Sequence, residues 1–151
     1  APPPAFVAQT GIEITTLDDL LGRADFVTLH TDLNLTSRHL IDAHRLGAMK
    51  RGAVLINTSR GPVVDERALI AALEEGALSG AALDVFEQEP LPADHPLWDQ
   101  PNVMLSAHMA GDFIGWRAAL GQQFVDNFHR WRRGQPLINP VNKEYGYVSS
   151  S

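Results

Sequence analysis

Short apolar runs, separated by polar and turn-forming residues, recur along the chain and predict four strands. The runs lie at residues 25–30, 53–57, 81–86 and 103–105. They do not alternate strictly between apolar and polar positions, which is typical of parallel strands buried on both faces. Segments with capping residues, or with apolar side chains at steps of three or four, predict helices. These segments lie at residues 17–21, 43–49, 66–75 and 112–132.

Residues at the ends of these segments support the predicted boundaries. Side chains that can accept hydrogen bonds from the first N–H groups of a helix precede three of the helices, at Thr16, Asp42 and Asp65. Pro2-Pro3-Pro4 predicts an extended connector, because proline is not tolerated in a helix interior or a central strand. Residues 139–151 predict an extended tail. Since strands alternate with helices, the chain predicts an α/β fold with a parallel sheet.

Three of the predicted strands lead into side chains that carry chemistry. The second strand leads into Arg60, the third into Glu89 and the fourth into His108. The carboxyl ends of parallel strands share one edge of the sheet, where open α/β sheets bind their ligands. A guanidinium, a carboxylate and an imidazole at that edge indicate proton-coupled chemistry on a small anionic substrate.

Composition narrows the class of protein. A length of 151 residues suits about one domain, and 44% hydrophobic and 20% charged residues are typical of a globular protein. The net charge of −6 weighs against nucleic acid as the main partner. The sequence has no run of 18 apolar residues, and residues 1–11 lack the features of a secretory signal. We therefore expect no nucleic-acid or membrane partner and a cytoplasmic location.

Cysteine and histidine usage bears on metal and redox chemistry. The absence of cysteine excludes disulfides, thiol catalysis and cysteine-ligated metal. The histidines do not show zinc-ligand spacing. We expect structural or solvated positions for His30, His39, His44, His95 and His129, with contact to a cofactor as an alternative for His30, which ends a strand. The aromatic residues that recur along the predicted helix at 112–132 favour packing in the core or against another subunit over cofactor binding.

The sequence lacks the glycine-rich loop that cradles a dinucleotide. No G-x-G-x-x-G occurs, and the glycines at Gly76 and Gly80 follow a helix rather than a strand, which indicates a turn. The predicted sheet is also smaller than a complete doubly wound dinucleotide fold. We therefore expect either half of a dinucleotide-binding unit or a protein that no longer binds a dinucleotide.

Four segments resemble the D-isomer-specific 2-hydroxyacid dehydrogenases, which include phosphoglycerate, glycerate and hydroxypyruvate dehydrogenases. They read L-H-T-D-L-N-L-T-S-R-H-L-I, L-I-N-T-S-R-G-P-V-V-D-E-R-A-L, A-A-L-D-V-F-E-Q-E-P-L-P and N-V-M-L-S-A-H-M-A-G, and they begin at residues 29, 55, 81 and 102. The resemblance implies a partial Rossmann-like sheet with flanking helices, the second half of a dinucleotide-binding domain. Residues 1–111 would form this part, and residues 112–151 a long return helix and tail towards the substrate domain. Because related enzymes are usually dimers, the resemblance also implies a homodimer for this protein.

The resemblance also implies roles for particular residues. Arg60 matches the arginine that binds the carboxylate and keto oxygen of the substrate, His108 the acid–base residue and Glu89 its carboxylate partner. Asp84 matches the residue that holds the nicotinamide carboxamide. Further cofactor positions match Thr58, Ser59, Arg60, His108, Met109, Ala110 and Gly111. Asp32 departs from the family pattern, which commonly has proline there.

These residues imply reversible hydride transfer between NAD or NADP and a small 2-keto or 2-hydroxy acid. Without the dinucleotide cradle, we expect the isolated 151-residue chain to be inactive. Two other interpretations stay open: an NAD(H)-sensing corepressor-like or scaffold protein of the same fold, and a degenerate truncated gene product. The sequence names neither the acid substrate nor the choice between NAD and NADP.

Overall fold

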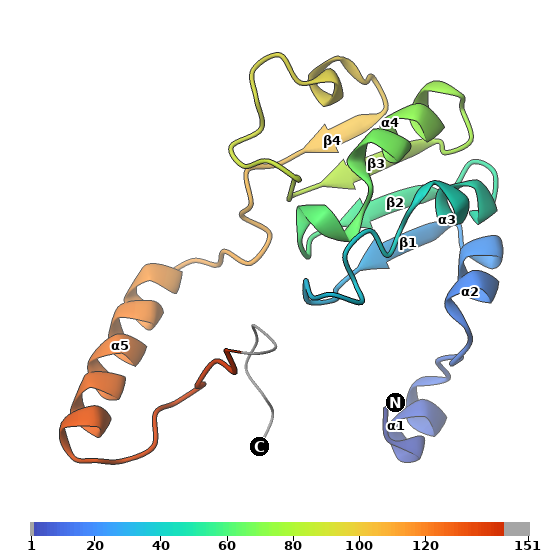
Figure 1. Cartoon of the computed structure of the whole chain (residues 1–151). Coiled ribbons are helices and arrows are strands. Elements are labelled where there is room, and N and C mark those ends of the chain that lie inside the picture. Colours follow the sequence, from blue (N-terminus) through green and yellow to red (C-terminus); the bar gives the residue numbers. More distant parts are fainter. Residues whose placement is uncertain (1, 144–151) are drawn as a thin grey trace.

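Four short parallel strands form one sheet in the computed structural model, which describes residues 2–143 (Figure 1). Their spatial order follows the chain, β1-β2-β3-β4. The strands are β1 (Phe26–Leu29), β2 (Val54–Asn57), β3 (Gly80–Leu83) and β4 (Val103–Leu105). Each pairs with the next in parallel. The α/β class and the parallel sheet predicted from the sequence are therefore confirmed.

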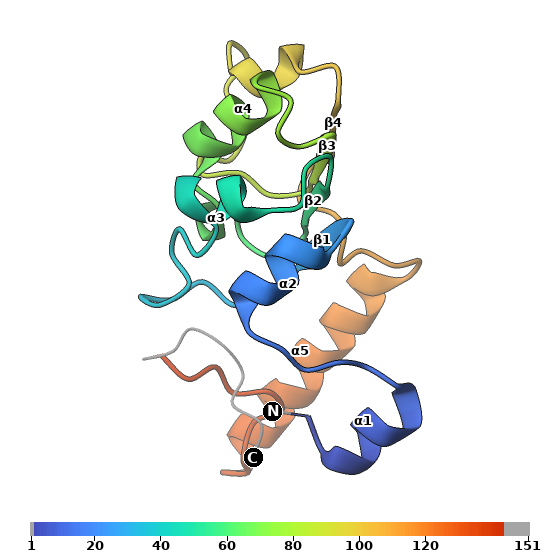
Figure 2. The same cartoon turned by 90° about the vertical axis from the view of Figure 1, so that its right-hand side faces the viewer.

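Three helices pack together on one side of this sheet (Figure 2). They are α2 (Leu17–Arg23), α3 (Ala43–Ala48) and α4 (Glu66–Glu74). Their predicted caps are present, because Thr16 accepts from Asp19 N, Asp42 from Arg45 N, and Asp65 from Ala68 N. Two 3₁₀ turns, η1 (Gly61–Val63) and η2 (Pro96–Asp99), lie in the loops that follow β2 and β3.

The opposite face of the sheet is open, so the prediction of strands buried on both faces is wrong for the described residues. Exposed and buried positions alternate along β1, and Phe26 and Met104 on the open face are 69% and 72% exposed. Crossovers between parallel strands are right-handed, and strands added in one direction therefore place their helices on the same face. The hydrophobic core lies between the helices and the face of the sheet that they cover, around Leu55, Leu69 and Leu83.

The two ends of the described chain differ from the sequence prediction. Helix α1 (Pro4–Thr10) begins within the proline run that predicted a connector, because proline suits the first turn of a helix, where its missing N–H is not needed. Helix α5 (Trp116–Arg132) begins four residues later than predicted, because Gly115 has φ 91° and interrupts the helical path. Residues 144–151 of the predicted tail lie outside the described part of the chain.

Helix α5 stands away from the sheet and contributes nothing to the core (Figure 1). Most of its apolar side chains, including Phe124 and Trp131, are exposed, and Trp116 is half-buried. The core role considered for this aromatic stripe is therefore wrong within the described residues, and a subunit contact stays a prediction. Across residues 2–143, no helix combines the length and apolarity needed to cross a lipid bilayer.

Candidate active site

The tip of β2 is shaped by a buried asparagine. Asn57 is 1% exposed; its Oδ1 accepts from the N–H of Ser59 at 3.1 Å and from Ser59 Oγ at 2.9 Å. Its Nδ2 donates to the backbone oxygen of Arg60 at 3.1 Å. These bonds fold residues 57–60 into a turn that carries Arg60 out to solvent. Sequence reasoning missed Asn57, although an asparagine just after an apolar run is a known turn former.

The tips of β2 and β3 touch through their backbones at Gly61. A Cβ built there would lie 1.8 Å from the carbonyl oxygen of Phe86 and 2.6 Å from the nitrogen of Glu87. Only a residue without a side chain allows this approach. Strand β3 itself ends at Leu83, shorter than the predicted run to residue 86, and the chain continues through buried Asp84, Val85 and Phe86.

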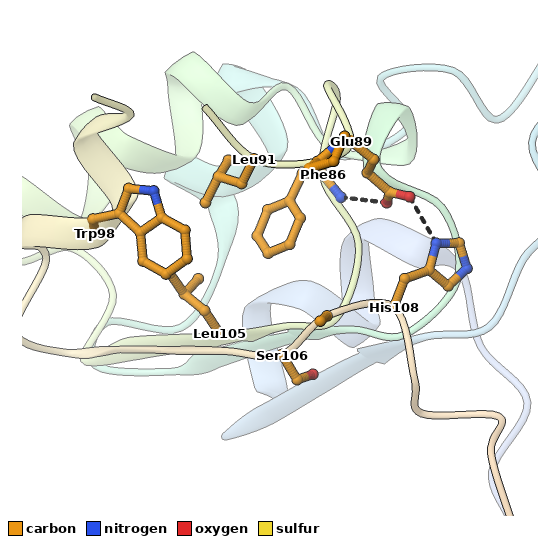
Figure 3. Close-up of a pocket in the computed structure, with 9 residues that line it drawn as sticks. Phe86, Glu89, Leu91, Trp98, Leu105, Ser106 and His108 are labelled. Atoms are coloured by element: carbon orange, nitrogen blue, oxygen red, sulfur yellow. Dashed lines mark hydrogen bonds and ion pairs between the residues drawn. The ribbon is translucent and has the colours of Figure 1, made fainter. Parts of the chain in front are cut away.

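A histidine and a glutamate meet at this edge of the sheet (Figure 3). His108 Nδ1 lies 2.7 Å from Glu89 Oε2, and Glu89 Oε1 accepts the N–H of Phe86 at 3.0 Å. A carboxylate can only accept hydrogen bonds, so Nδ1 carries the proton and Nε2 is directed elsewhere. Burial raises the pKa of Glu89, but the bonds from His108 and Phe86 and the charge of Arg60 lower it by more, so its pKa lies below the ordinary value.

Arg60 stands beside this pair rather than in it. Its Nη1 donates to the backbone oxygen of Ser59 at 2.6 Å, and its charge reaches Glu89. A guanidinium has five N–H donors, and among residues 2–143 this bond occupies one of them, which leaves donors for a ligand. The structure thus brings together two of the three predicted groups, Glu89 and His108, and places Arg60 within electrostatic range.

A cavity of about 570 Å³ opens beside His108 and Glu89. Its walls are mainly apolar and are formed by Phe86, Pro90, Leu91, Trp98, Leu105, Ser106 and Ala107. Figure 3 shows the Trp98 indole at the far end from His108. Sequence reasoning did not assign Phe86 or Leu105 to a site, because apolar residues at strand ends have the same pattern as core residues.

Asp84, predicted to hold the nicotinamide carboxamide, is 4% exposed and already bonded within the chain. Its Oδ1 accepts from Ser106 Oγ at 2.5 Å and from the N–H of Met109 at 2.9 Å, and its Oδ2 accepts from the N–H of Ala110 at 2.8 Å. Burial raises the pKa of Asp84, but these bonds lower it by more, so that it lies below the ordinary value.

The other predicted cofactor residues line the same edge. Thr58 is half-buried at the β2 tip, whereas Ser59 is buried with its hydroxyl bonded to Asn57. Met109, Ala110 and Gly111 are exposed after His108. A ligand can therefore reach this edge at Thr58 and along residues 108–111, whereas the side chain of Ser59 is not accessible to it.

Two histidines that do not line the cavity join a network of carboxylates. His39 Nε2 lies 3.0 Å from Glu87 Oε1, and His95 Nε2 lies 3.1 Å from Glu66 Oε1. Glu66 Oε2 also accepts the N–H of Glu87 at 3.2 Å. Burial raises the pKa of Glu66. The network anchors Glu87, two residues before Glu89, to the first turn of α4.

Comparison with known proteins decides the family. The family described as D-isomer specific 2-hydroxyacid dehydrogenase, NAD binding domain, matches residues 2–110. This chain belongs to that family. The glyoxylate reductase of Korarchaeum cryptofilum is 44% identical over 139 residues, which are 92% of this chain and 42% of the reductase. The glyoxylate reductase of Thermofilum pendens is 47% identical over 133 residues, 88% of this chain and 39% of the reductase. The chain spans about two fifths of the length of these curated relatives.

Solved structures share the fold of this chain. The TT0316 protein from Thermus thermophilus has a TM-score of 0.84 at 39% identity, over 94% of this chain and 44% of that one. A family member from Xanthobacter autotrophicus Py2, crystallised with NADPH and MES, has a TM-score of 0.75 at 44% identity, over 87% of this chain and 53% of that one. The resemblance seen in the sequence is confirmed. The roles of individual residues and the division near residue 111 stay predictions.

Proposed function

We propose that this chain supplies the acid–base half of an active site that interconverts a small 2-keto acid and its 2-hydroxy acid with NADH or NADPH. The observation that carries the proposal is the His108–Glu89 pair at the carboxyl edge of the sheet, 2.7 Å apart. Glyoxylate and hydroxypyruvate are the first substrates to test, because relatives are glyoxylate and glyoxylate/hydroxypyruvate reductases.

His108 acts on the proton of the reaction. With Nδ1 bonded to Glu89, Nε2 is the atom that donates a proton to the keto oxygen during reduction and takes it back during oxidation. The carboxylate holds the ring in one orientation and stabilises the imidazolium that precedes donation. The bond from Phe86 N–H to the other oxygen of Glu89 also favours the orientation in which the carboxylate faces the histidine.

Arg60 acts on the charge of the substrate. Its planar guanidinium can bind a carboxylate through two parallel N–H groups, which a lysine cannot do. Negative charge grows on the keto oxygen during reduction, and a fixed cation beside it stabilises the transition state. The Asn57 turn and the close contact at Gly61 hold the backbone from which this side chain extends.

The described residues fit one end of a nicotinamide dinucleotide. When bound, the nicotinamide supplies the hydride. Thr58 and the exposed residues 109–111 would hold this end; a Cβ built at Gly111 would meet nothing within 4 Å, so the backbone there is open to a ligand. The sequence offers no G-x-G-x-x-G loop for the pyrophosphate, so the chain fits the nicotinamide end alone.

A chimera tests the proposal. This chain replaces the 139 residues that it matches in the Korarchaeum cryptofilum glyoxylate reductase, and oxidation of NADH or NADPH by glyoxylate is followed at about pH 7. We expect turnover in the chimera and none in the isolated chain. His108→Gln should lower kcat by about 10²- to 10⁴-fold, the usual contribution of a positioned acid–base group.

The matched control is His129→Gln, an exposed histidine on α5, which should leave kcat unchanged. Wild-type activity in the folded His108→Gln chimera would contradict the assigned role. A chimera that binds NADH without turnover would instead favour the sensor or scaffold interpretation.

A further inference from the structure

One buried aspartate binds the segment that carries His108. Asp84, directly after β3, receives four hydrogen bonds from residues 106–110, three of them at its carboxylate. Its backbone oxygen accepts the N–H of His108 at 2.9 Å, and its side chain accepts from Ser106 Oγ, Met109 N and Ala110 N. Two successive backbone N–H groups thus point at one carboxylate, which is fixed at the end of a core strand.

The backbone of His108 needs such an anchor. Its φ is 52°, in the left-handed region that residues with a side chain rarely adopt. Strained backbone of this kind persists only where surrounding contacts impose it. The segment is exposed on the surface, and Met109 is 54% exposed, so packing does not impose it. The hydrogen bonds of Asp84 and one from Ser106 N to Leu83 O are what tie these residues to the sheet.

The strained backbone sets the direction of the imidazole. Asp84 holds the main chain at His108 and at the two residues that follow it, and Glu89 holds the ring through Nδ1 at 2.7 Å. If the segment relaxed to an ordinary φ, the side chain would leave the His108 Cα in another direction and lose Glu89. The two carboxylates therefore act on the same histidine, one through the backbone and one through the ring.

We propose that Asp84 is a positioning residue, which holds His108 in the left-handed conformation that directs its ring to Glu89. This role rests on the proposed function of His108. It is distinct from the carboxamide contact that the family resemblance implies: donors of this chain already take three of the roughly four acceptor positions of the Asp84 carboxylate.

Asp84→Asn tests the proposal with almost no change in shape. One carboxylate oxygen becomes an NH₂ group, which cannot accept from a backbone N–H. In the 151-residue chain, amide hydrogen exchange at Met109 or Ala110 should become about tenfold faster, as expected for one lost hydrogen bond. Amides of β2 should not change. The matched control is Asp112→Asn, an exposed aspartate just beyond the segment, which should leave exchange at both amides unchanged.

Kinetics in the reductase chimera separate positioning from cofactor binding. A misdirected acid should lower kcat by about 10- to 100-fold, the effect of a misplaced catalytic group, with KM for the cofactor changed less than about threefold. A carboxamide contact predicts the reverse, a raised cofactor KM with kcat preserved at saturation. That reverse result, or unchanged exchange at Met109 and Ala110, would overturn the positioning role.

Failure of this role can be told apart from failure of the proposed function. An inactive wild-type chimera would refute the function, whereas the exchange data test the anchoring of His108 in either case. If Asp84→Asn does not fold, amide hydrogen exchange in the unmodified chain tests the positioning role instead. Its Met109 and Ala110 amides should exchange at least about tenfold more slowly than unstructured amides despite their exposed side chains. Unprotected amides would overturn the proposal.

Discussion

The contact between the β2 and β3 tips makes Gly61→Ala the sharpest test of the site's construction. A methyl group at this position would lie 1.8 Å from Phe86 O and 1.9 Å from Phe86 C, whereas ordinary contacts of a Cβ begin at 3.4 Å. Both neighbours are backbone atoms, so no side chain can rotate out of the way. The two tips would have to separate by more than an ångström.

The surrounding hydrogen bonds resist this separation, and they determine how much stability Gly61→Ala loses. Glu87 N–H is bonded to Glu66, and Phe86 N–H to Glu89, so the displaced segment would strain both. Overpacking a well-packed site costs about 1–3 kcal/mol and sometimes more. We expect the upper end, about 3 kcal/mol, which is a large share of the roughly 5–15 kcal/mol that stabilises an ordinary domain.

Urea unfolding of the 151-residue chain, followed by circular dichroism, measures this loss. With a slope of about 1–3 kcal/mol per molar urea, the midpoint should fall by at least about 1 M. The matched control is Gly47→Ala on α3, where a Cβ meets nothing within 4 Å, so the change should stabilise the helix by up to about 1 kcal/mol. A Gly61→Ala midpoint equal to the wild type would refute the close contact and the fixed geometry derived from it.

Two further predictions use the opposite pKa shifts of two glutamates. Burial raises the pKa of Glu66 above its ordinary value of 4.5. The shift therefore stabilises the folded chain fully below pH 4.5, and this contribution is lost as the pH rises through the higher pKa of the folded state. Stability of Glu66→Gln relative to wild type should therefore increase with rising pH in urea titrations, and a constant difference would contradict the burial. Glu89, with a lowered pKa, contributes stability above 4.5 that is lost as pH falls through the folded pKa. The advantage of wild type over Glu89→Gln should shrink on acidification below 4.5, and its persistence would argue against the bonds to His108 and Phe86.

Local features of this protein followed from the sequence alone. Each predicted cap, at Thr16, Asp42 and Asp65, bonds to a backbone N–H three residues ahead, and such bonds depend on no distant part of the chain. The parallel sheet also followed, since alternation of strands and helices leaves few other arrangements. The family resemblance supplied the candidates Arg60, Glu89 and His108. Their positions after strands placed them at one edge, because parallel strands end on the same side.

Contacts between distant segments were decided only by the tertiary structure. The open sheet face depends on the common direction in which the strands are added, which no run of residues encodes locally. Asp84 has the sequence pattern of a strand-end acid; its donors, Met109 and Ala110, lie 25 and 26 residues further along the chain. The left-handed backbone of His108, with φ 52°, lies within the segment that those bonds tie to Asp84. The sequence determined which groups stand at the edge, and hydrogen bonds between the segments that follow β3 and β4 determined the surroundings in which the histidine is held.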